Sequence, residues 1–199
     1  MRTVIIGGTF NPVHIGHLML AEEARVQEGF ERVVFVPSNK PAHKMVDGTT
    51  VAQRLEMLKL AIRGYDVILE TCELAREGIS YSIDTVRYVL SHYELSGRPS
   101  LVLGDDLFES FSTWKDADEL STLAELLVAH RKYPHQLASP WPHRYLDNKL
   151  IDVSSTEIRE RVRQDRAWRA LVPTAVAGYI ETHHLYMEPH HLDRESASS

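Results

Sequence analysis

The fold is indicated near the N-terminus, where residues 3–17 read TVIIGGTFNPVHIGH. The run from Thr3 to Ile6 is apolar and β-branched, which favours a buried strand. Gly7 and Gly8 end this run, because glycine tolerates tight turns that other residues resist. Pro12 and the spacing after it favour the start of a helix. A strand that passes through a glycine-rich turn directly into a helix predicts an α/β protein.

Further strand and helix patterns alternate along the chain. Short apolar runs predict strands at residues 32–36, 66–71, 100–103, 125–129 and 149–153, and helical spacing predicts helices at 14–25, 51–62 and 83–90 and two more after residue 158. Continuous apolar strands are typical of a parallel sheet covered on both faces. We therefore expect an α/β fold of the Rossmann-like, doubly wound type, with a mainly parallel sheet and helices on both faces. One domain should span residues 1–186, with an irregular loop at 133–145 and a disordered tail at 187–199.

Composition excludes several classes of protein. The chain has 199 residues and a formal net charge of −6, so it lacks the basic surface that general nucleic-acid binding needs. Its single cysteine, Cys72, allows neither an intrachain disulfide nor a cysteine metal cluster, and we expect it to be a buried strand residue. No apolar run reaches the ~18 residues of a membrane span. We expect a cytoplasmic protein without a membrane or nucleic-acid partner.

The turn after the first strand carries residues suited to polyphosphate. Gly7 and Gly8 would let a phosphate approach the backbone closely. His14 and His17 lie three residues apart, so they share one face of the helix start, where free N–H groups and the helix dipole attract anions. Gly16 between them leaves room for a flat group. A simpler interpretation is a tight turn with two surface histidines.

A second candidate phosphate site follows the predicted strand at 149–153, where residues 153–159 read VSSTEIR. Ser154 or Ser155 can cap the next helix, and a capping box alone would explain the pattern. The same hydroxyls and free N–H groups, with Arg159 one turn into the helix, could instead hold a phosphate. Residues 131–169 contain nine Lys or Arg against five Asp or Glu, which favours an anion site.

The two motifs together resemble those of the bacterial nicotinate-nucleotide adenylyltransferase family, part of the nucleotidyltransferase superfamily, with H-x-G-H near the start and I-S-S-T-x-I-R near the end. Residues 37–44, 79–85, 104–106 and 171–173, with Trp114, extend the resemblance to almost the whole chain up to Tyr186. It implies transfer of the adenylyl group of ATP to nicotinate mononucleotide, which gives deamido-NAD and pyrophosphate in NAD biosynthesis. Mg²⁺ would enter with ATP.

The resemblance also assigns roles to residues. His14, His17, Lys44 and Arg159 would be the catalytic cations. The expected ATP-binding residues are Gly7, Gly8, Thr9, Phe10, His14, Gly16, His17, Gly104, Asp106, Ser154, Ser155, Thr156 and Arg159. The expected mononucleotide-binding residues are Asn39, His43, Lys44, Thr85, Trp114 and Arg131, with Trp114 stacking on the pyridine ring. Asp106 could take a ribose hydroxyl or a metal-bound water, and no other protein side chain is expected at a metal.

Departures from the family pattern leave alternatives open. Asn11 stands where Asp is commoner, which would remove a carboxylate contact to metal, and Lys115 follows Trp114 where an aromatic residue is frequent. One alternative is an adenylyltransferase for nicotinamide mononucleotide or phosphopantetheine. The other is a nucleotide-binding module without turnover, against which the intact His14, His17 and Arg159 argue. The sequence leaves open whether copies associate and how strongly the acid is preferred over the amide.

Overall fold

The computed structural model describes residues 1–41, 49–76, 78–133 and 135–188. A six-stranded sheet runs through the molecule in the order β4-β2-β1-β6-β7-β8, and every pair of neighbours in it is parallel. A second, two-stranded sheet pairs β3 with β5. The strands are β1 (Thr3–Gly8), β2 (Arg32–Pro37), β3 (Lys40–Pro41), β4 (Ile68–Leu69), β5 (Ile79–Ser80), β6 (Ser100–Gly104), β7 (Glu125–Ala129) and β8 (His143–Tyr145).

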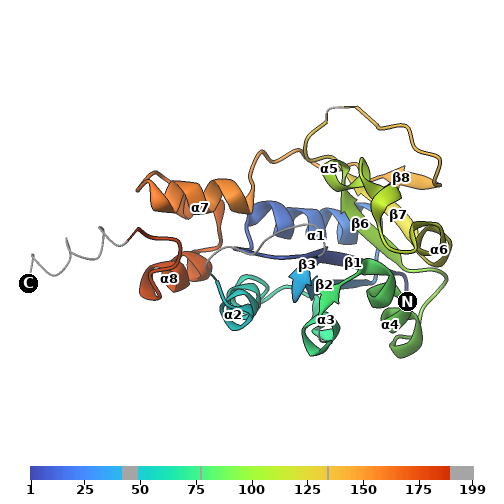
Figure 1. Cartoon of the computed structure of the whole chain (residues 1–199), viewed down its shortest axis with the longest axis horizontal. Helices are drawn as coiled ribbons and strands as arrows, with labels where there is room; N and C mark the ends of the chain where they lie inside the picture. Colours follow the sequence, from blue (N-terminus) through green and yellow to red (C-terminus); the bar gives the residue numbers. More distant parts are fainter. Residues whose placement is uncertain (42–48, 77, 134, 189–199) are drawn as a thin grey trace, which may run out of the picture.

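Helices connect these strands and cover both faces of the large sheet. In Figure 1, α7 and α8 lie at one end of the molecule, and α5, α6 and β8 lie at the other. The helices are α1 (Ile15–Gln27), α2 (Val51–Ala61), α3 (Cys72–Ala75), α4 (Ser82–His92), α5 (Asp105–Phe108), α6 (Ala117–Leu123), α7 (Ser155–Arg163) and α8 (Thr174–Thr182), with short 3₁₀ turns at Phe111–Thr113 and Arg169–Leu171. Among the described residues, none of these helices is long and apolar enough to cross a membrane.

Side chains of each central strand alternate between two apolar cores. In β1, Val4 and Ile6 join the core formed with α1, α2, α7 and α8, whereas Ile5 joins the core formed with α4 and α6. This alternation follows from the two-residue period of a strand, and it requires helices on both sides. The predicted doubly wound α/β fold is therefore confirmed.

Two local predictions differ from the structure. The predicted strand at 149–153 is wrong: Val153 packs into the core from a loop, while the last strand is His143–Tyr145, inside the predicted irregular loop. Prolines just before that strand hide it, and an edge strand tolerates them. Cys72 is buried as predicted but begins helix α3 and does not lie in a strand.

Two residues beyond the predicted end of the domain contact it. Met187 packs against the core, and Glu188 pairs with Arg163 at 3.3 Å. The boundary at residue 186 stays a prediction. Residues 189–199 lie outside the described residues.

Candidate active site

The sheet order fixes where a ligand can bind. The chain builds outward from β1 through β2 and β4 on one side, and then through β6, β7 and β8 on the other. Ligands of such sheets bind beyond the carboxyl ends of the strands at this switch point, between β1 and β6. A cavity lies there and is lined by the strand ends Gly8, Gly104 and Ala129. The start of α1 and the start of α7 line the same cavity, so the two predicted phosphate motifs meet.

His14, which is buried, and His17, which is half-buried, lie against each other at the start of α1. Their ring centroids lie 3.7 Å apart, and the backbone N–H of His14 donates to Nδ1 of His17 at 3.2 Å. Burial lowers the pKa of His14 from 6.5 to about 3 and moves the pKa of His17 well below 6.5, with Arg131 and, for His17, the neighbouring His14 adding to the effect. Both shifts favour the neutral form of the imidazoles, and the role of His14 and His17 as catalytic cations stays a prediction.

Phe10 and the glycines shape the turn around this pair. The ring of Phe10 is buried, with its edge toward His17 at a centroid distance of 5.0 Å. A Cβ on Gly8 would lie 3.0 Å from that ring, and a Cβ on Gly16 would lie 3.0 Å from Val153 and 3.1 Å from His14. A Cβ on Gly7 would meet nothing within 4 Å. Of the glycine pair, only Gly7 leaves open space for a phosphate, while Gly8 makes room for Phe10.

The start of α7 braces the first turn. Ser154 caps α7 by accepting from the N–H of Glu157 at 3.1 Å, as the capping interpretation predicted. Ser155 donates its hydroxyl to the carbonyl oxygen of Pro12 at 2.8 Å, and Arg159 donates to the carbonyl oxygen of Asn11 at 2.8 Å. Since Ser154, Ser155 and Arg159 also line the cavity, the motif combines capping, bracing and a positive charge facing the cavity.

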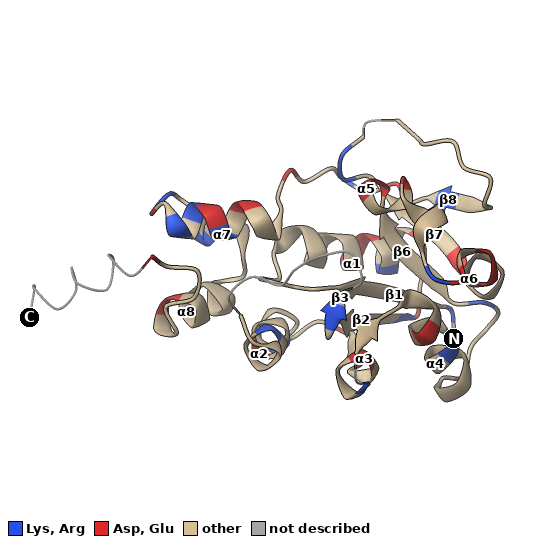
Figure 2. Ribbon diagram, viewed as in Figure 1, with Lys and Arg blue, Asp and Glu red and all other residues tan. Residues whose placement is uncertain are grey.

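Most of the basic charge in this region is neutralised locally. Arginines alternate with glutamates along α7 (Figure 2), where Arg161 pairs with Glu157 and Arg163 with Glu160, each at 2.7 Å. The excess of basic residues between 131 and 169 is therefore not a measure of the anion site. The basic side chains of this stretch that line the cavity are Arg131, Lys149 and Arg159.

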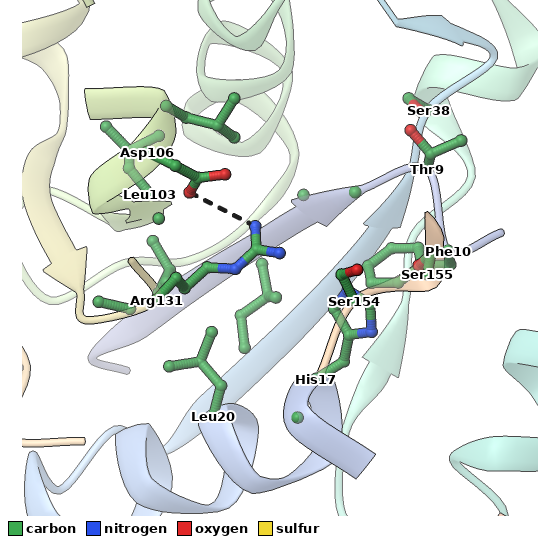
Figure 3. Close-up of a pocket in the computed structure, with 18 of the residues that line it drawn as sticks. Thr9, Phe10, His17, Leu20, Ser38, Leu103, Asp106, Arg131, Ser154 and Ser155 are labelled. Carbon is green, nitrogen blue, oxygen red and sulfur yellow. Dashed lines mark ion pairs between the residues drawn. The ribbon is translucent and has the colours of Figure 1, made fainter. Parts of the chain in front are cut away.

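Arg131 and Asp106 face each other inside the cavity at 3.6 Å. Figure 3 shows the Arg131 side chain extending from Asp106 towards His17 and Ser154. The buried carboxylate of Asp105 holds the segment after Arg131, because it accepts backbone hydrogen bonds from Lys132 at 2.9 Å and Tyr133 at 3.0 Å. A Cβ on Gly104 would lie 2.6 Å from Cδ of Arg131, so a larger residue there would have to displace this side chain.

Asn11 lines the cavity, but its side-chain oxygen is held by two hydroxyl groups. Its side-chain oxygen accepts hydrogen bonds from the hydroxyls of Tyr186, at 2.6 Å, and Thr49. Asn11 and Tyr186 therefore connect the first turn to the end of the domain. Burial raises the pKa of Tyr186 to about 12, so its hydroxyl stays protonated and able to donate.

The residues expected at the mononucleotide fall into three groups. Trp114 and Arg131 line the cavity. Asn39 and Thr85 lie behind its wall: the N–H of Asn39 donates to the hydroxyl of Ser80 at 3.0 Å, and the buried hydroxyl of Thr85 donates to Glu73. Ser80 and Glu73 line the cavity in their place. His43 and Lys44 lie outside the described residues.

Comparison with known proteins shows to which family the chain belongs. Residues 5–161 match the family model described as cytidylyltransferase-like. A protein of Borreliella burgdorferi, named as a probable nicotinate-nucleotide adenylyltransferase, is 42% identical over 190 residues, which cover 94% of this chain and 98% of that protein. The chain belongs to the nicotinate-nucleotide adenylyltransferase family.

Another relative supports this assignment, and one solved structure has the same fold. A Lactiplantibacillus plantarum protein of the same printed name is 36% identical, over 93% of this chain and 88% of that protein. The structure of the Plasmodium falciparum nicotinic acid mononucleotide adenylyltransferase in complex with NaAD superposes with a TM-score of 0.77. It is 19% identical and covers 94% of this chain and 98% of that one, so it confirms the fold.

In this adenylyltransferase, sequence analysis missed several residues that shape the site. The first is Glu73, which lines the cavity and whose pKa is raised above the usual range by burial. The second is Asp105, which holds the segment after Arg131. No pattern in the sequence distinguishes it from its neighbour Asp106. The third is Arg54, which had a visible signal: it lies on the same face of its predicted helix as Val51, Leu55 and Leu58, where a charged residue is unexpected.

The donor groups of the adenylyltransferase cavity fit a magnesium ion carried by a nucleotide. No group of three or more His, Cys, Asp or Glu able to hold a metal occurs within the described residues. Asp106 places one carboxylate in the cavity, and its Oδ1 is buried without a hydrogen-bond partner there. Mg²⁺ is usually bound through substrate phosphates, waters and one or two carboxylates, so a single Asp beside a phosphate site suits it.

Proposed function

We propose that this chain transfers the adenylyl group of ATP to nicotinate mononucleotide, giving deamido-NAD and pyrophosphate in NAD biosynthesis. The observation that carries the proposal is one cavity lined by both phosphate motifs, around His17 and Ser154, and by Trp114 and Lys115. A reaction between two nucleotides needs such adjacent sites, because the reacting phosphates must meet in line. The family membership names the substrates.

In the reaction, an oxygen of the mononucleotide phosphate forms a bond to the α-phosphorus of ATP. The bond from that phosphorus to the β-phosphate oxygen breaks, and pyrophosphate leaves with the electron pair. A phosphate monoester has its second pKa near ~6, so it is already ionised at neutral pH and needs no strong general base. Burial raises the pKa of Cys72, the single cysteine, to about 11, so its thiol is not a reactive nucleophile. The protein therefore has to align two anions and stabilise the charge that develops on pyrophosphate.

Neutral donors and fixed cations share this work in the proposal. His17 accepts a hydrogen bond at Nδ1, so its proton sits on Nε2 and can be donated to a phosphate oxygen. Arg159 and Arg131 supply positive charge. Trp114 offers a flat face to the pyridine ring, and base–aromatic stacking is worth about 1–3 kcal/mol in comparable sites. Asn39 and Thr85 act from behind, through Ser80 and Glu73.

The proposal also includes Mg²⁺ and a cytoplasmic setting. Asp106 is the described residue that would hold a water of the ion, and ATP phosphates would supply its other ligands. When bound, Mg²⁺ neutralises charge on the phosphates. His43 and Lys44 remain predicted contacts to the mononucleotide phosphate.

The test is a product assay with three acceptors. The purified protein is incubated with ATP, excess Mg²⁺ and nicotinate mononucleotide, nicotinamide mononucleotide or phosphopantetheine, and products are separated by chromatography. We expect deamido-NAD and pyrophosphate in equal amounts with the first acceptor. Faster reaction with another acceptor would change the substrate, and no pyrophosphate release with any acceptor would support a binding module instead.

A further inference from the structure

Arg54 of α2 is a buried guanidinium behind the wall of the active-site cavity. Its side chain is only 1% exposed, although it is one of the largest in the protein. Nη1 donates to the carbonyl oxygens of Thr9 at 2.7 Å and Ser38 at 2.9 Å, and Nη2 donates to that of Asn39 at 3.1 Å. All three acceptors are backbone carbonyls, so peptide dipoles and not a carboxylate receive its hydrogen bonds. Such a residue is costly to bury, which calls for an explanation.

The three carbonyls belong to two different loops of the site. Thr9 follows β1 and lies in the turn expected to bind ATP, whereas Ser38 and Asn39 follow β2 in the segment expected to serve the mononucleotide. Thr9 and Ser38 both line the cavity and lie near each other in Figure 3. The N–H of Ser38 also donates to the carbonyl oxygen of Gly8 at 2.9 Å, so the loops already touch at their bases. Arg54 joins them a second time, one residue further on.

The hydrogen bond to Thr9 also orients a donor. In a trans peptide the C=O and the N–H point in opposite directions, and the Thr9–Phe10 bond is not the cis one, which is Asn11–Pro12. Because Arg54 holds the Thr9 carbonyl on the α2 side, the N–H of Phe10 points away from α2. Arg159 holds the carbonyl of Asn11 in the same turn at 2.8 Å. Two arginines, one from α2 and one from α7, therefore hold the backbone of this turn.

We propose that Arg54 is a positioning residue for adenylyl transfer. Its forked guanidinium fixes the distance between the ATP loop, which is the turn at Thr9, and the mononucleotide loop, which is the segment at Ser38 and Asn39. In this way it aligns the two phosphates. This inference rests on the proposed function. Arg54 does not line the cavity and touches neither substrate. Its effect should therefore appear in the turnover number, because each substrate still binds its own loop while their alignment is lost.

Lysine separates the effect of the fork from the effect of charge. An ammonium keeps the positive charge, but it is a compact group on a flexible stem and cannot reproduce the planar fork that reaches three carbonyls in two loops. Arg54→Met removes both charge and donors. If alignment depends on the fork, both variants lose turnover; if only the charge matters, Arg54→Lys keeps it.

The experiment measures kcat and both KM values for wild type, Arg54→Lys and Arg54→Met. Each kcat is divided by the folded fraction of that protein, which is measured by circular dichroism at the assay temperature. Arg63→Lys and Arg63→Met are the matched controls, since Arg63 follows the same helix and is exposed. We expect kcat to fall by about 10²-fold in both Arg54 variants, with little change in either KM, and no change in the controls. Because Met removes the Arg54 donors from three carbonyls, of which the one on Ser38 is buried, Arg54→Lys decides if Arg54→Met does not fold.

Two results would overturn the inference. Turnover of Arg54→Lys equal to wild type per folded molecule would show that the fork does not align the substrates. A rise in KM for ATP alone, with unchanged kcat, would make Arg54 a support for one substrate. An inactive wild type would overturn the proposed function along with this inference, whereas an active wild type with unaffected Arg54 variants would overturn only the role of Arg54.

Discussion

His14 and His17 stand against each other at the start of α1, and the backbone N–H of His14 donates to Nδ1 of His17 at 3.2 Å. One hydrogen bond thus does two things. It satisfies a backbone donor at the helix start, and it assigns the tautomer of His17, because a nitrogen that accepts carries no proton. The remaining proton of the neutral ring lies on Nε2. In its neutral form, the second histidine of H-x-G-H is therefore oriented to donate from Nε2.

The first prediction separates the two nitrogens of His17. His17→Gln places an amide N–H₂ near the position of Nε2 and should keep part of the activity. His17→Asn places its polar atoms nearer to Nδ1 and should lower kcat by about 10²-fold or more, the typical effect of removing one donor to developing charge. Steady-state kinetics at saturating substrates measure both. Equal activity of the two variants would show that donation from Nε2 is not part of the mechanism.

The second prediction concerns stability against pH. In the unfolded chain His14 takes up a proton near pH 6.5, whereas in the folded protein its pKa is about 3. Between these values the unfolded state binds more protons, so the free energy of unfolding falls as the pH is lowered below about 6.5. For one such histidine the slope approaches about 1.4 kcal/mol per pH unit. Urea unfolding at pH 7.5, 6.5, 5.5 and 5.0 measures it.

The matched variant for this prediction is His14→Gln, which removes the titrating ring but keeps a polar side chain. We expect its free energy of unfolding to depend less steeply on pH than that of wild type over the same range. His92→Gln is the control, because His92 lies on the exposed side of α4 and stacks on Tyr88. If wild type and His14→Gln have the same slope, His14 does not stay neutral in the folded state.

The sequence predicts those strands whose apolar pattern is local, and it does not predict those that depend on pairing with a distant part of the chain. The apolar residues Val4, Ile5 and Ile6 are continuous because both faces of β1 are covered, and that pattern is local and visible. The strand at His143–Tyr145 is not visible, because three residues directly after a proline carry little pattern and gain their structure from pairing with β7. The strand predicted at 149–153 fails for the opposite reason, because the side chain of Val153 packs into the core without its backbone joining the sheet.

The candidate site divides in a similar way. Residues on the strand ends and helix starts, such as Gly8, His17 and Arg159, could be placed from sequence because the fold fixes where those ends meet. Thr85 could not, because its contact with Glu73 depends on how α3 and α4 pack. The charge state of His14 and His17 was also out of reach, since burial sets it and burial is a property of the folded protein.

The third prediction concerns Gly7. A Cβ there would meet nothing within 4 Å, yet Gly7 lines the cavity, so the added methyl should occupy space that a phosphate needs. We expect Gly7→Ala to leave the melting temperature almost unchanged and to raise KM for ATP. Gly178→Ala is the control, since Gly178 lies in α8 with equally open surroundings and the change favours a helix. Unchanged kinetics in Gly7→Ala would mean that no ligand approaches this point of β1.

The last prediction concerns the choice between acid and amide. Nicotinate mononucleotide differs from the nicotinamide form by a carboxylate in place of a neutral amide, and Lys115 lines the cavity beside Trp114. Its ammonium lies 3.2 Å from Asp84 and over the ring of Tyr81, with 41% of the side chain exposed, so its charge is partly balanced and screened. Exposed charge pairs are worth about 0.2–1 kcal/mol, so Lys115→Met should lower the acid-to-amide ratio of kcat/KM by no more than about fivefold. Asp84→Asn should raise that ratio, because it frees the ammonium.

Lys59→Met is the control for this last prediction, since Lys59 is exposed and pairs with Glu56 at 3.5 Å, far along the sequence from Trp114. The ratios are measured for each protein with both mononucleotides at low and high salt, and the effect of Lys115 should shrink as salt rises. If Lys115→Met keeps the wild-type ratio, backbone donors alone select the acid; if wild type itself prefers the amide, the nicotinate assignment is wrong while adenylyl transfer stands.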